Sequence, residues 1–185
     1  KDTYFALNDI IAHLLSQSVF PIIIGGSQDL TYSVYQAYES FTKGINLLCV
    51  DSRFDLLNKD ALNVNSRNYI GHIIRQDPNH LTNFINIGYQ SYLCQNDESD
   101  LLKKMLFEAY RLGDVRANIK SVEPCLRSAD IVSMDLSSIK QSDAPGTVAP
   151  SPNGLESHHA CVISRYAGMS DRVSSLGLFE FSIDN

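Results

Sequence analysis

Two continuous apolar segments, separated by one amphipathic segment, most strongly constrain how this chain folds. The apolar segments are VFPIII (19–24) and INLLCV (45–50), and neither alternates apolar with polar residues. Continuous apolar runs predict strands that are covered on both faces. Between them, apolar side chains recur at helical spacing, at Leu30, Val34, Ala37, Tyr38 and Phe41. A strand, helix, strand order predicts a parallel pair, because the crossover helix returns the chain to the same end of the sheet.

The same alternation continues along the chain. Helical spacing also predicts a helix before the first strand, with Leu7, Ile10, Ile11, Leu14 and Leu15 on one face. Further strands are predicted at 83–88, 130–136 and 176–182, and a helix begins near Ser157. Another predicted helix carries Leu101, Leu102, Met105, Leu106 and Ala109. The chain has 185 residues, 44% of them hydrophobic. We expect one α/β domain over residues 1–185, with three α/β/α layers and a parallel sheet.

Charge and cysteine usage narrow the classes of partner and compartment. The net charge is −6, without the cluster of Lys and Arg that a phosphate backbone attracts. No apolar run approaches the roughly 20 residues that span a bilayer. The cysteines are scattered without a CxxC pair, which favours small buried side chains in a reducing compartment. These features predict a cytoplasmic protein that binds neither nucleic acid nor membranes.

Polar residues follow several predicted strands, where ligands bind in open parallel sheets. GGSQD (25–29) follows the first strand, DSRFD (51–55) the second and DLSS (135–138) the fourth. Asp51, Asp55 and Asp135 would therefore converge, which is costly unless a metal ion or Arg53 neutralises them. Any one such Asp is also a common helix cap, so the functional interpretation depends on the combination.

The order of these motifs resembles the ureohydrolase family of arginases, agmatinases and formimidoylglutamases. GGSQDLT resembles the family's Gly-Gly-Asp-His-Ser motif, and VDSRFDL resembles Asp-Ala-His-x-Asp. VSMDLSSIKQSDAPG resembles its Ser-x-Asp-x-Asp-x-x-Asp-Pro motif and Pro-Gly loop, and GLFEFS resembles its segment with a substrate-binding Glu. The resemblance implies an arginase-like fold, a pair of manganese ions and hydrolysis of linear amidines. It also implies that 1–185 is a domain incomplete at both ends.

Carried over residue by residue, the resemblance implies that half of the metal ligands are replaced. Asp51, Asp55 and Asp135 are retained, whereas Gln28, Arg53 and Ser137 stand in place of two His and one Asp. Arg53 cannot coordinate a metal because its guanidinium has no lone pair to donate. The resemblance therefore allows one hard divalent ion, Mn²⁺, Mg²⁺ or Ca²⁺, held by the three Asp and Gln28, or no ion.

The main prediction is a non-catalytic homologue, without a cofactor, that keeps a ligand-binding or assembly role. We expect Arg53 to lie between Asp51 and Asp135 as a fixed charge in place of the second ion. Glu180, Gln28 and Arg53 are the candidate ligand-binding residues, for a small cationic ligand, and a homo-oligomer is a further prediction. Glu180 is alternatively only a polar residue at a strand end.

The alternative prediction is an active hydrolase of guanidino or formimino carbon-nitrogen bonds that uses one divalent ion. In that case the resemblance implies catalytic roles for Asp55 and Glu180.

Overall fold

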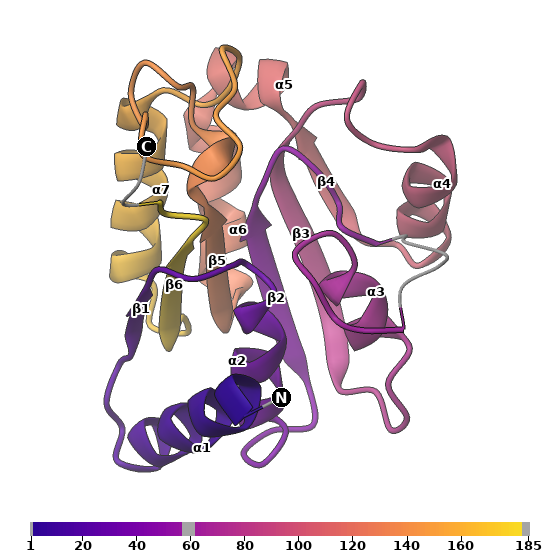
Figure 1. Ribbon diagram of the computed structural model, residues 1–185, viewed down its shortest axis with the longest axis vertical. Helices are drawn as coiled ribbons and strands as arrows, with labels where there is room; N and C mark the ends of the chain where they lie inside the picture. Colours follow the sequence, from indigo (N-terminus) through magenta and orange to yellow (C-terminus); the bar gives the residue numbers. More distant parts are fainter. Residues whose placement is uncertain (1, 57–61, 183–185) are drawn as a thin grey trace.

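The chain forms a six-stranded sheet with helices on both faces, in a computed structural model that describes residues 2–56 and 62–182 (Figure 1). The strands are β1 (Ile22–Ile24), β2 (Ile45–Val50), β3 (Leu81–Tyr89), β4 (Glu108–Arg111), β5 (Ile131–Asp135) and β6 (Ser175–Phe179). Their order is β1-β6-β5-β2-β3-β4, and every neighbouring pair is parallel. The predicted parallel α/β fold is therefore confirmed.

Helices and short turns of helix connect these strands. The α-helices are α1 (Asp2–Ser16), α2 (Leu30–Tyr38), α3 (Tyr69–Ile74), α4 (Asn96–Lys104), α5 (Leu112–Ala117), α6 (Glu123–Ser128) and α7 (Ser157–Met169). Two 3-10 turns are η1 (Ile119–Val122) and η2 (Leu136–Ser138). Within residues 2–56 and 62–182, every helix is too short or too polar to cross a lipid bilayer.

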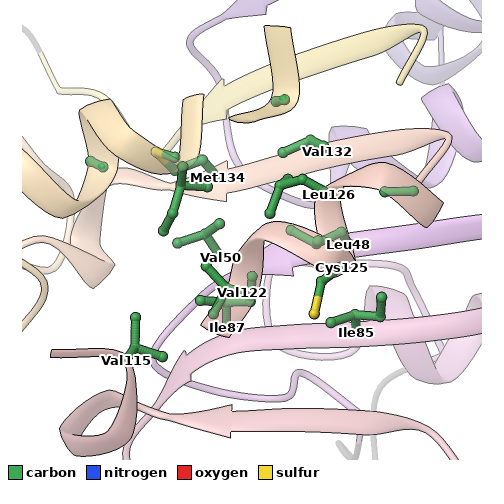
Figure 2. Close-up of a cluster of buried hydrophobic side chains, with 14 of the residues drawn as sticks. Leu48, Val50, Ile85, Ile87, Val115, Val122, Cys125, Leu126, Val132 and Met134 are labelled. Carbon is green, nitrogen blue, oxygen red and sulfur yellow. The ribbon is translucent and has the colours of Figure 1, made fainter. Parts of the chain in front are cut away.

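Two buried apolar clusters lie on opposite faces of the sheet. Side chains of α5, α6 and α7 pack on one face, where Leu48, Val50, Ile85 and Ile87 meet Val115, Val122 and Leu126 (Figure 2). Side chains of α1, α2, α3 and α4 pack on the other face, against alternate residues of β2 such as Leu47 and Cys49. Because β2 contributes to both clusters, its continuous apolar sequence is explained by burial on both sides.

The prediction that the first strand is buried on both faces is wrong. Only Ile22–Ile24 form β1, and Ile22 and Ile24 are 60% and 71% exposed. In the described sheet β1 is an edge strand, paired only with β6 (Figure 1). With a neighbouring strand on one side only, β1 has fewer side chains around its faces than a central strand has, and the sequence pattern alone does not reveal that position.

The predicted helix over 101–109 is also partly wrong. α4 ends at Lys104, Leu106 adopts a left-handed backbone conformation (φ 59°), and Ala109 lies in β4. Leu106 is exposed, so its apolar side chain fits a helical period without joining the core. The polar sequence of β4 (EAYR) gave no strand signal, and pairing with β3 is what makes it a strand.

We expect Gly71→Ala to destabilise the fold. A Cβ at Gly71 in α3 would lie 2.0 Å from the backbone oxygen of Leu56, which cannot move aside as a flexible side chain can. Gly168→Ala in α7 is the matched control, because a Cβ there meets nothing within 4 Å. Urea unfolding should show a loss of about 1–3 kcal/mol for Gly71→Ala. For Gly168→Ala it should show no loss or a gain of up to about 1 kcal/mol. Equal stabilities of the two variants would contradict this packing.

Candidate functional site

Four predicted site residues follow the carboxyl ends of neighbouring strands. Val50 pairs with Met134 and Asp135 pairs with Phe179, so Asp51, Asp135 and Glu180 lie at successive strand ends of β2, β5 and β6. Gln28 follows β1 and joins the same edge, because its backbone N–H donates to Glu180 Oε1 at 2.8 Å. All four residues are buried. The sheet order therefore brings together the strand-end residues that the sequence predicted.

Asp51 and Asp55 form a buried carboxylate pair. Asp51 Oδ1 accepts the backbone N–H of Arg53 at 2.8 Å, whereas Oδ2 of both residues has no donor in the described part of the chain. Burial raises the pKa of Asp55 to about 7, although the hydrogen bond with Asp51 and the charge of Arg67 lower it. Burial, and next the charge of Asp55, raises the pKa of Asp51 well above its ordinary value. Since ionised carboxylates only accept hydrogen bonds, this pair needs a shared proton or another cation.

Asp135 is the third buried carboxylate of this edge. Its Oδ1 accepts the backbone N–H of Ser137 at 2.6 Å, at the start of η2. Burial, and next the charge of Asp51, raises the pKa of Asp135 well above its ordinary value. The charges of the three Asp therefore affect one another's pKa values, as expected for carboxylates at one edge of a sheet.

Gln28 is held in a hydrogen-bonded network between the β1–α2 loop and β5. Its Nε2 donates to Ser133 Oγ at 3.4 Å, and Ser133 Oγ lies 2.7 Å from Thr31 Oγ1. The Gln28 side-chain amide thus links the β1–α2 loop to β5.

Glu180 also makes contacts within the protein. Its Oε1 accepts from Ser27 Oγ at 3.2 Å and from the backbone N–H of Gln28, and its own N–H donates to Gly26 O at 2.8 Å. Glu180 has a positive φ of 63°, which turns the chain at the end of β6. One carboxylate oxygen therefore fastens the β1–α2 loop to β6, whether or not the other oxygen meets a ligand.

Arg53 does not lie as we expected. Its Nη1 donates to the backbone oxygen of Leu93 at 3.1 Å, and no ion pair joins it to Asp51 or Asp135 in residues 2–56 and 62–182. Asp51 Oδ1 instead accepts the backbone N–H of Arg53, and Leu93 holds the side chain of Arg53. The neighbouring cation is Arg67, whose Nη1 lies 3.8 Å from Asp55 Oδ1. Sequence reasoning missed Arg67, which lies in a segment that matched no motif.

A cavity of about 250 Å³ opens beside these residues. It is lined by Ser52, Arg53, Arg67, Leu93, Asp135, Ser137, Ala149, Pro150 and Ser151. Residues 149–151 belong to the long loop between η2 and α7, drawn in orange in Figure 1. A larger cavity of about 470 Å³ is lined by Asp130 and Ser174, which precede β5 and β6, and by none of the strand-end carboxylates. The smaller cavity is therefore the candidate functional site.

Residues 2–56 and 62–182 contain no group of three or more His, Cys, Asp or Glu side chains arranged to hold a metal ion. The three Asp are near enough to shift one another's pKa values, yet they do not form such a group in this structure.

The parallel three-layer fold, with acidic residues buried at the ends of β2 and β5, defines an arginase-like protein. Manganese-bound formiminoglutamase from Trypanosoma cruzi has a similar fold, with a TM-score of 0.88 and 20% identity over 98% of this chain and 63% of that one. Formimidoylglutamase from Bacillus subtilis gives a TM-score of 0.84 at 19% identity, over 98% of this chain and 60% of that one. Arginase from Bacillus cereus gives 0.79 at 16% identity, over 96% and 68%.

The chain belongs to the Arginase family, whose model matches residues 2–183. It is also 22% identical over 162 residues to an uncharacterized 32.2 kDa protein in the hmfB 3′ region of Methanothermus fervidus. That match covers 86% of this chain and 55% of the relative. The chain thus spans about half the length of this curated relative and about three fifths of the two formiminoglutamase-type structures.

The buried carboxylate pair predicts that stability falls as pH rises. The folded state keeps a proton on Asp55 up to about pH 7, whereas an unfolded Asp releases it near pH 3.8. Between these values the folded state binds more protons, so raising the pH favours unfolding. In metal-free buffer, Asp55→Asn should reduce the loss of stability between pH 5 and pH 8 by at least about 1 kcal/mol. The control is Asp171→Asn at an exposed position. Equal pH dependence of wild type and Asp55→Asn would contradict the role of this pair.

Proposed function

We propose that this chain is a non-catalytic member of the Arginase family that keeps a ligand-binding pocket at the carboxyl edge of its sheet. The observation that carries the proposal is the state of the three replaced ligand positions. Gln28 Nε2 donates to Ser133, the guanidinium of Arg53 donates to Leu93, and the Ser137 backbone N–H donates to Asp135 Oδ1. The Gln28 and Arg53 side chains bond to protein groups, whereas the buried Ser137 Oγ has no partner among the described residues. None of the three side chains offers an imidazole nitrogen or a carboxylate.

The remaining metal-ligand candidates, the oxygens of the three Asp, do not fit a pair of metal ions. Asp51 and Asp135 each direct Oδ1 to a backbone N–H. The buried Oδ2 atoms of Asp51 and Asp55 have no hydrogen-bond donor among the described residues, and the buried Ser137 Oγ has no partner there either. Two close carboxylate oxygens can share one proton or contact one cation, but they cannot complete the coordination of two ions. We therefore derive no hydrolytic step through a metal pair for this chain.

The alternative is a hydrolase that uses one divalent ion held by Asp51, Asp55, Asp135 and Gln28. The two buried oxygens that lack donors favour it, since a hard cation would satisfy both. Metal analysis and activity separate the two proposals. The small cationic ligand, the homo-oligomer and the cytoplasmic location remain predictions.

The first test measures metal content and hydrolysis together. After dialysis against Mn²⁺, we expect fewer than two ions per chain and no release of urea, ammonia or formamide from guanidino or formimino compounds. Two bound ions with measurable release would overturn the proposal. One bound ion with measurable release would favour the alternative.

The second test restores the missing ligand types. The triple variant Gln28→His, Arg53→His and Ser137→Asp should bind Mn²⁺ at least about tenfold more tightly than the wild type. The affinity would be measured by calorimetry. A matched control carries Gln28→Asn, Arg53→Gln and Ser137→Ala, which remove the same side chains without adding ligands of the family's type. If the triple variant binds Mn²⁺ no better than the control, the assignment of the family's motifs to these positions is wrong.

A further inference from the structure

Two arginine side chains line the 250 Å³ cavity at the carboxyl edge of the sheet. We propose that Arg53 and Arg67 bind the carboxylate group of a small organic acid in this cavity. The inference rests on the proposed function, because both guanidiniums occupy the site as the protein's own cations. It also gives that pocket a ligand class opposite in charge to the cationic ligand that the sequence suggested.

The guanidinium of Arg53 has N–H groups that are available to a ligand. A guanidinium carries five N–H donors, and within the described residues the side chain of Arg53 makes a single hydrogen bond, to the backbone oxygen of Leu93. That bond fixes one end of the planar group beside the cavity. A held, planar guanidinium with free N–H groups matches the two oxygens of a carboxylate, which it can bind bidentately.

Arg67 supplies a second cation to the same space. Its nearest described acidic atom is Asp55 Oδ1 at 3.8 Å, a distance that allows attraction but exceeds that of a hydrogen bond. The Arg67 side chain is 44% exposed, whereas that of Asp55 is 2% exposed. Arg67 therefore lines the cavity with a guanidinium that makes no hydrogen bond to the described residues, so its N–H groups are open to a ligand.

Arginines outnumber acidic residues in the lining of the cavity, and Asp55, which faces Arg67, does not line it. Asp135 is the one acidic residue among those that line it, against two arginines, and its Oδ1 already accepts the Ser137 N–H. Ser151 adds a neutral donor, because its Oγ accepts the backbone N–H of Asn153 at 3.3 Å and its O–H remains to be donated. An anion is thus the ligand whose charge this lining complements.

The volume limits the ligand to a small acid. A water molecule occupies about 30 Å³ of liquid, so 250 Å³ corresponds to a ligand of about eight non-hydrogen atoms. Succinate has this size and carries a carboxylate at each end. It is therefore the probe for the experiment below.

The test is calorimetric titration of the protein with succinate in chelator-treated, metal-free buffer. We expect saturable binding of one succinate per chain, weakened about tenfold or more by Arg53→Gln and by Arg67→Gln. Arg53→Lys should give an intermediate affinity, since it keeps the charge but loses the planar fork. Arg165→Gln, at an exposed position of α7 outside the cavity, is the matched control and should bind as the wild type does. Thermal melts check that each variant is folded.

The outcomes separate this inference from the proposed function. Absence of succinate binding to a wild-type protein that also holds no metal pair would overturn the carboxylate site and leave the non-catalytic assignment intact. Succinate binding that requires two Mn²⁺ ions would overturn both. Binding of methylguanidinium, but not succinate, at this cavity would replace the anionic ligand by a cationic one. Binding unaffected by either arginine substitution would place the acid elsewhere and overturn the proposal.

Discussion

Burial of several carboxylates at one edge of a parallel sheet is the constraint on which the site depends. Asp51, Asp55 and Asp135 are each nearly inaccessible to water, and burial is the largest cause of the raised pKa of all three. Removing a carboxylate from water is costly unless hydrogen bonds or cations compensate it. Backbone N–H groups of Arg53 and Ser137 compensate part of this cost. The buried carboxylates of Asp51 and Asp55 still require a proton or a nearby positive charge.

Metal ions can meet such a need in metal-dependent enzymes, and a guanidinium can contribute to it as well, as Arg67 does with its Nη1 3.8 Å from Asp55 Oδ1. The difference matters for chemistry, because a metal ion brings the pKa of bound water from about 15.7 toward 7. A guanidinium only donates hydrogen bonds and cannot coordinate water as a Lewis acid. Under the function proposed above, the arginines at this edge would suit a site that holds an anion rather than one that makes hydroxide.

The sequence also has clear limits where tertiary contacts decide the outcome. The sequence pattern does not predict β4 or the exposure of the edge strand β1. Which residues a short strand accepts depends on its position in the sheet. Charge alone predicts that Arg53 lies between Asp51 and Asp135. Its side chain instead contacts Leu93, about 40 residues later in the chain, a partner that no local pattern identifies.

The sequence by itself determined the parallel α/β order, the motif positions and the identity of the residues at the strand ends. These properties follow from apolar periodicity and from residue types at fixed spacing, which are local. Only the tertiary structure decided that β2, β5 and β6 adjoin, that Glu180 fastens the β1–α2 loop, and that Arg67 joins Arg53 at the cavity. Such pairings join residues far apart in the chain, so their geometry is fixed by packing of the whole sheet.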